Sequence, residues 1–140
     1  MNRSRRTEIL IKGSEAVAKR LCEEIEGKYE VNTVDEPNYG LVMIKMREEA
    51  QKSLFYLGEV FVTEAKVQIY GSIGIGLVIG NKLELSYWLS VIDAAYNAGL
   101  EEVKGWERVF IEEEKRINER IKMEQAKVLM TKVSFDTMDS

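Results

Sequence analysis

The sequence contains no histidine, and its 140 residues include one cysteine and one proline. Without histidine, this chain cannot supply a Ser-His or Cys-His catalytic pair, an imidazole general base or a histidine metal ligand. The single thiol, Cys22, forms no internal disulfide and no zinc cluster, which is typical of a protein in a reducing compartment. Catalysis within the chain would depend on carboxylates, lysine, arginine or tyrosine, and this lowers the expectation of a self-sufficient enzyme.

Long apolar runs and an excess of basic charge are also missing. No run approaches the ~20 residues of a membrane span, and the first residues lack the apolar core of a signal peptide. The formal net charge is −4, so there is no general attraction to nucleic acid or an anionic membrane. We therefore expect a cytoplasmic protein that binds neither nucleic acid nor membrane.

The composition that remains is that of a globular chain, with 45% apolar and 31% charged residues. Its length predicts a single domain over residues 1–140. Residues 3–12 and 15–26 are expected to be helical. On the second helix Val17, Leu21 and Ile25 recur at helical spacing. Cys22 lies beside this stripe without a visible partner base, and we interpret it as a small core residue.

The centre of the chain, residues 57–93, predicts strands joined by a tight turn and followed by a helix. Gly71-Ser72 suits a two-residue type II′ hairpin turn, because glycine tolerates positive φ. The alternation from residue 73 to 79 indicates a strand with one buried face. Gly74, Gly76 and Gly80 have the wrong spacing for a dinucleotide fingerprint. They favour close packing of a helix on the sheet, with phosphate binding as the weaker alternative.

The expected strands are residues 29–36, 41–46, 54–62 with 65–69, and 73–79, with a bulge or bend near Thr63-Glu64. The order of elements shows no alternation of strands with helices. It predicts an α+β fold with an antiparallel sheet of four or five strands, two N-terminal helices and two C-terminal helices, the last one long.

The helix after the sheet is expected to start at Asn81, with Glu84 completing a capping box. Backbone N–H groups at such a start can bind an anion, so Gly80, Asn81 and Lys82 form a weak candidate anion site. Asp93 borders the apolar face of this helix, which favours an ion pair or an interface over acid–base chemistry. We expect no metal site and no cofactor in this chain.

A long charged helix is expected over residues 107–130, with a narrow apolar stripe that suits a surface or another chain. The tail, residues 132–140, begins with a strand-like segment and is expected to contact a partner. The candidate partner interface comprises Phe110, Ile117, Ile121, Phe135 and Met138.

Several short motifs in a fixed order resemble a known family. They are Gly40-Leu41-Val42, Leu57-Gly58-Glu59-Val60, Val62-Thr63, Gly76 with Gly80, Ile92-Asp93-Ala94, and the segment from Val133 to Met138. Together they make the chain similar to the G subunit of the bacterial phosphonate carbon–phosphorus lyase system. The likeness covers roughly residues 14–138. Glu64, Asn81-Lys82-Leu83 and Asp136 depart from residues that are common in that family.

The resemblance implies a subunit that acts with the H, I and J subunits of a core complex, the I subunit most directly. With the H, I and L subunits the family supports replacement of adenine in ATP by methylphosphonate, giving ribose 1-methylphosphonate 5-triphosphate. ATP and the phosphonate would then be substrates of the complex. Two other functions remain open: a free-standing anion- or nucleotide-binding module at Asn81, and a self-assembling structural protein with the 107–130 helix as its seam, a homo-oligomer when alone.

Overall fold

The structure is a computed structural model that describes the backbone of residues 1–48 and 53–138, and the side chains of residues 1–43 and 58–132. The chain divides into two compact units, Glu15–Lys104 and a second unit of Met1–Ser14 with Gly105–Ser140. The assignment of one domain to residues 1–140 stays a prediction.

The larger unit combines helices with a three-stranded antiparallel sheet in the order β1-β2-β3. Its elements are α2 (Glu15–Glu26), β1 (Asn32–Glu48), β2 (Ser53–Ile69), β3 (Ser72–Ile79) and α3 (Leu83–Asn97), followed by a 3-10 helix at Glu101–Gly105. The α+β class and the four α-helices are confirmed, but the prediction of four or five strands is wrong.

The strand count differs because two predicted breaks lie inside continuous strands. The first predicted break was at Pro37, but β1 continues through this residue. The β1–β2 ladder instead shifts register between Asp35 and Asn38. The bulge or bend expected near Thr63-Glu64 corresponds to this same irregularity, which lies opposite Glu64–Lys66. β2 pairs with β3 without a shift from Val62 to Ile69, and the extra residue lies opposite, on β1. A strand can absorb a proline at such an irregularity.

The hairpin turn between β2 and β3 lies one residue earlier than predicted. Ile69 pairs with Ser72, so Tyr70 and Gly71 are the two turn residues, and both have positive φ, 48° and 79°. Positive φ at both positions is the type I′ pattern rather than type II′. The Tyr70 ring makes an edge contact with Tyr29, with centroids 5.7 Å apart, which helps to hold this unusual conformation.

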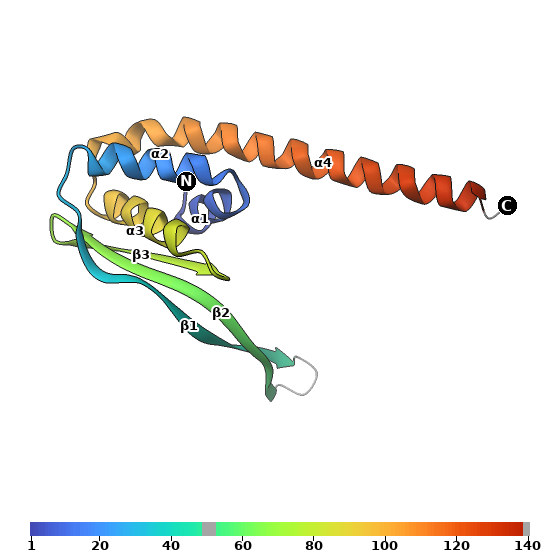
Figure 1. The fold of residues 1–140 in the computed structure, drawn as a ribbon, viewed down its shortest axis with the longest axis horizontal. Helices are drawn as coiled ribbons and strands as arrows, with labels where there is room; N and C mark the ends of the chain where they lie inside the picture. The colour runs from blue at the N-terminus through green and yellow to red at the C-terminus, as the bar shows by residue number, and fades with distance from the viewer. Residues whose placement is uncertain (49–52, 139–140) are drawn as a thin grey trace. The chain divides into compact units, whose positions relative to one another are not determined.

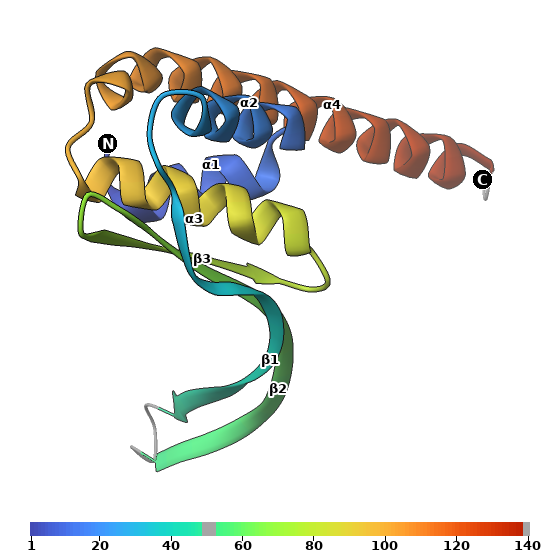
Figure 2. The same cartoon turned by 60° about the vertical axis from the view of Figure 1, so that its left-hand side comes forward.

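Helix α3 lies across one face of the sheet, and α2 lies against α3, so the unit has a sheet layer and two helix layers (Figure 1). The predicted stripe on α2 is confirmed, since Val17, Leu21, Cys22 and Ile25 are all buried. The strands β1 and β2 have 17 residues each and β3 has 8. The long hairpin therefore continues beyond β3 as a curved two-stranded arm (Figure 2).

The smaller unit consists of α1 (Arg3–Lys12) and the 33-residue α4 (Trp106–Met138). An ion pair joins Arg5 to Glu114, and the Ser14 amide donates to Glu113 at 3.0 Å. The expected strand-like tail is wrong, because α4 continues to Met138. In the sequence of this tail, residue 135 continues the seven-residue spacing of Ile121 and Val128. No helix in the described part of the chain is long and apolar enough to cross a membrane.

Candidate interaction surfaces

The two faces of β3 differ in side-chain size. Gly74 and Gly76 lie under α3, where an added Cβ would overlap backbone atoms of Ser90 and Ser86, so the predicted role of these two glycines in close packing is confirmed. For Gly80 this prediction is wrong, because an added Cβ would meet no atom within 4 Å. The larger residues of β3 lie on the opposite face. Ile73, Ile75, Leu77 and Ile79 are 39–72% exposed. This leaves an apolar sheet face without a helix in the larger unit.

The arm carries a second exposed apolar surface, which we call the apolar strip: Tyr39, Leu41, Met43 and Phe61. Leu41 pairs with Phe61 in register, and Tyr39 pairs with Thr63, so these side chains share one face of the ribbon. The rings of Tyr39 and Phe61 lie 5.1 Å apart. The four side chains are 42–64% exposed. In the body of the sheet, the same face is covered by α3.

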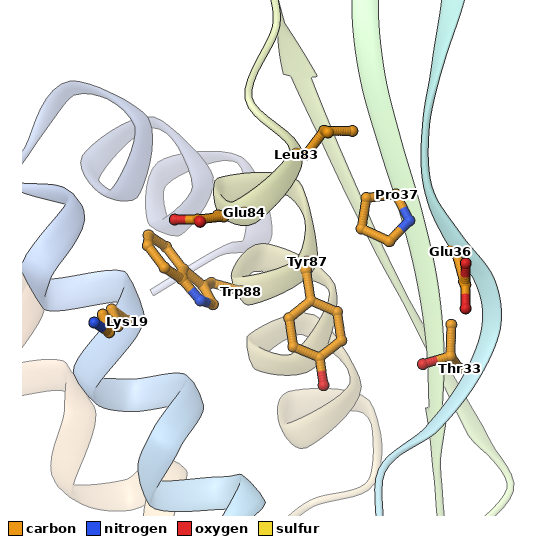
Figure 3. A pocket seen from close by; sticks show the side chains of 8 residues that line it. All are labelled: Lys19, Thr33, Glu36, Pro37, Leu83, Glu84, Tyr87 and Trp88. Atoms are coloured by element: carbon orange, nitrogen blue, oxygen red, sulfur yellow. The ribbon is translucent and has the colours of Figure 1, made fainter.

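At the base of the arm a hollow of about 510 Å³ opens between α3, β1 and α2 (Figure 3). Leu83, Tyr87, Trp88 and Pro37 supply its apolar surface. The Tyr87 hydroxyl donates to Glu26 at 3.2 Å, and burial next to that carboxylate raises the pKa of Tyr87 to about 12. The remaining lining residues are Lys19, Thr33, Glu36 and Glu84. The tyrosine thus stays protonated at neutral pH.

The loop before α3 differs from the predicted capping box. The helix starts at Leu83 with Lys82 as N-cap, so Asn81 is not the cap, and its side chain accepts the Tyr39 hydroxyl at 2.8 Å. Thr63, from β2, takes the capping role: its hydroxyl donates to the Gly80 carbonyl and accepts the Lys82 amide.

The groups proposed for anion binding are engaged within the protein. The Lys82 ammonium lies 3.1 Å from a Glu15 carboxylate oxygen, and the Lys82 amide already has Thr63 as its acceptor. An anion would have to displace these contacts. The site at Gly80, Asn81 and Lys82 therefore stays a prediction with little support from the geometry.

The predicted partner interface on α4 divides into buried and exposed parts. Phe110 is fully buried and Ile117 is 6% exposed, so both are core residues of this chain. Ile121 is 37% exposed. The side chains of Phe135 and Met138 lie outside the described residues. Beyond Ile121, four further apolar residues are 61–71% exposed: Met123, Val128, Leu129 and Met130.

Cys22 and Asp93 both have structural partners. The Cys22 thiol is completely buried and donates to Glu26 at 3.1 Å, which agrees with a core residue. Asp93 accepts the Ile75 amide at 2.9 Å and so ties α3 to β3. Within the described residues no group of three or more histidine, cysteine, aspartate or glutamate side chains could hold a metal ion.

The environment of Cys22 predicts a pH dependence of stability. Burial, with a smaller contribution from Glu26, raises the pKa of the folded thiol above its ordinary value. The unfolded thiol ionises near pH 8.5, so above that pH the unfolded state binds fewer protons than the folded state. The free energy of unfolding should therefore fall as pH rises from 8 to 10, by at most about 1.4 kcal/mol per unit.

Urea titrations at pH 8 and pH 10 measure this effect. Cys22→Ala should have a shallower slope of stability against pH than the parent chain, whatever its absolute stability. An equal slope in both proteins would show that the thiol does not cause it. The same burial predicts that a maleimide reagent modifies Cys22 only after unfolding.

The family model described as phosphonate metabolism protein PhnG matches residues 1–139. The chain belongs to the PhnG family. Members are the G subunit of carbon–phosphorus lyase, a component of that complex, and this places the chain in phosphonate metabolism. A search of curated proteins found no match.

The family match confirms the resemblance seen in the sequence, but sequence patterns missed the residues around the hollow. Glu36 lies about fifty residues before the neighbouring Tyr87 and Trp88, and it meets them only when α3 lies beside β1. A signal for the apolar strip was present, because residues 41–46 are almost continuously apolar and could not all face one core.

Proposed function

We propose that this PhnG-family chain is a subunit of the carbon–phosphorus lyase core complex that supports replacement of adenine in ATP by methylphosphonate. The product would be ribose 1-methylphosphonate 5-triphosphate. ATP and the phosphonate are then substrates of the whole complex, and this subunit contributes no cofactor. The proposed partners are the H, I and J subunits, the I subunit most directly, in the cytoplasm.

The observation that carries this proposal, together with the family match, is the exposed apolar surface on the C-terminal half of α4. Helices of monomeric proteins keep such side chains scattered, whereas contiguous exposed apolar patches mark interaction sites. Ile121 and Val128 are seven residues apart, and position 135 follows at the same spacing on the continuous helix. A partner subunit that covers this side of α4 would bury the whole stripe.

A charge placed in the stripe should disrupt the complex. Val128→Glu puts a carboxylate among apolar residues that the partner is proposed to desolvate, and its burial there has no counter-charge. We expect co-purification with the I subunit to fall at least about tenfold. The measurement is native mass spectrometry of the co-expressed subunits, with the amount of hetero-complex compared between variants.

Ala126→Glu adds the same charge on the side of the helix opposite Val128, where the exposed Met123 and Met130 lie three and four residues away, so it tests whether the partner covers one side of α4 or both. It should retain the complex. Complex formation by Val128→Glu at the level of the parent chain would remove this stripe as the docking site. Phe135→Glu and Met138→Glu extend the same test to the predicted tail contacts.

The same stripe favours a second function, self-assembly through α4. Native mass spectrometry of the isolated chain separates the two. A dimer that persists when the I subunit is present would favour the structural protein, and a dimer that gives way to a hetero-complex would favour the lyase subunit.

A further inference from the structure

The carboxylates that line the hollow are not paired. Glu36 and Glu84 are both exposed, and neither side chain forms a hydrogen bond or ion pair with a residue that the structure describes. Lys19 is the one cation among the lining residues. The indole of Trp88 extends from α3 toward Lys19 of α2, and the ring of Tyr87 lies on the side of α3 that faces β1 (Figure 3). Aromatic faces beside carboxylates favour an ammonium or guanidinium group.

The hollow continues into the apolar strip of the arm. Pro37 lines the hollow, and Tyr39 follows on the same strand, where its hydroxyl bonds to Asn81 next to the lining region of α3. From there Phe61, Leu41 and Met43 extend the apolar surface. At the far end Met43 pairs with Glu59, which is also exposed. The combined surface is apolar in the middle and mainly acidic at both ends.

We propose that the hollow and the apolar strip form one docking surface for an amphipathic helix of another protein. The apolar face of that helix covers Tyr39, Leu41, Met43 and Phe61. Its lysine or arginine side chains meet Glu36 and Glu84 at one end and Glu59 at the other. This inference rests on the proposed function insofar as the helix belongs to another subunit.

The geometry favours a helix over a small molecule. The lining residues of the hollow are mostly exposed, so it encloses no ligand, whereas small-molecule sites bury most of the ligand surface. The strip lies on the sheet face that α3 covers over Ala65 and Val67. From Tyr39 to Met43 it spans about 13 Å, which roughly nine helical residues would cover. A partner helix would therefore extend the existing helix layer along the arm.

Charge complementarity determines the chemistry of the partner. The residues Glu15–Lys104 contain 15 acidic and 9 basic side chains, a formal charge of −6 for this unit. A basic helix is attracted to such a surface, and an acidic helix with the same apolar face is repelled. The acidic groups at both ends of the surface predict basic residues at both ends of the apolar face of the partner helix.

The test uses the full chain and two synthetic 14-residue amphipathic helices, one of leucine and lysine and one with glutamate at every lysine position. Fluorescence anisotropy of the labelled peptides measures binding. The leucine–lysine peptide should bind saturably and the leucine–glutamate peptide should not. Leu41→Ser combined with Phe61→Ser should weaken binding about thirtyfold, because two central apolar contacts are lost.

Glu36→Gln combined with Glu84→Gln tests the charges without a threat to folding, since both side chains are exposed. Binding should weaken about fivefold. Glu30→Gln with Glu112→Gln removes two exposed carboxylates elsewhere, and Ile73→Ser removes an exposed apolar residue from the far end of β3. These controls should bind as the parent chain does.

Equal binding of both peptides, or equal weakening in test and control variants, would overturn the inference. Neither result would affect the co-purification of the chain with the I subunit through α4. Conversely, if the chain does not bind the I subunit but binds the leucine–lysine peptide as predicted, this docking surface is supported and the proposed function is not.

Discussion

Gly76→Ala is expected to lower the free energy of unfolding by about 3 kcal/mol or more, because the added methyl group has no space. A Cβ at this position would overlap the Ser86 carbonyl and lie 2.8 Å from the Ser90 amide nitrogen. These are backbone atoms of α3, which cannot rotate away as a side chain can. The helix would have to move off the sheet, and with it the buried contacts of Val91 and Ile92.

The sign of this prediction is informative, since alanine in place of glycine usually stabilises a chain by restricting the unfolded state. Gly40→Ala is the control, because its Cβ would meet only the Val62 side chain at 3.8 Å, an ordinary contact. Urea unfolding of both variants gives the comparison. If Gly76→Ala were as stable as Gly40→Ala, the close approach of α3 to β3 would be wrong.

Thr63→Val should cost about 2–3 kcal/mol of stability although the two side chains have nearly the same shape. The fully buried Thr63 hydroxyl donates to the Gly80 carbonyl at 2.5 Å and accepts the Lys82 amide at 3.1 Å. Valine fills the space but leaves both backbone groups without this partner, and an unsatisfied buried polar group costs about 1–3 kcal/mol.

Thr63→Ser separates hydrogen bonding from packing. Serine keeps the oxygen and loses one methyl group, worth about 1 kcal/mol. Thermal or urea unfolding should therefore rank the parent chain first, serine second and valine last. A valine variant at least as stable as the serine variant would show that the hydroxyl does not hold the connection between β3 and α3.

Local patterns predicted the helices because each depends on its own sequence. Val17, Leu21 and Ile25 define the buried side of α2 through spacing alone, and their burial is confirmed. The role of Gly74 and Gly76 in close packing could also be predicted from the sequence. Glycines that alternate with large apolar residues in a strand indicate a close backbone neighbour on the glycine side.

Features that depend on residues distant in the sequence could not be predicted from local patterns. Asn81 has the side chain of a good helix cap, but Thr63 reaches the same backbone groups from a neighbouring strand, 19 residues before Lys82. The Tyr70 ring at the hairpin turn contacts Tyr29, which lies 41 residues earlier in the chain. Pro37 interrupts the local pattern of β1, yet the strand continues because it pairs with β2 on both sides of the proline, with a register shift between Asp35 and Asn38.

Of the candidate surfaces, the stripe on α4 was predicted from the sequence and the hollow was not. The periodic stripe on α4 was visible, but periodicity could not show that Phe110 lies inside and Val128 outside, because that depends on which part of the helix is covered. The hollow requires α3, β1 and α2 together, and no single segment carries its pattern.

The attachment of α3 to the outer edge of β3 has a consequence for aggregation. β3 is an uncharged run without proline, SIGIGLVI, at the edge of its sheet, and such strands readily add the strand of another molecule. Asp93 occupies the Ile75 amide and Asn97 donates to the Ile73 carbonyl, so α3 caps this edge with its own side chains. A helix that mainly serves the core thereby also occupies two backbone groups with which the strand of another molecule could pair.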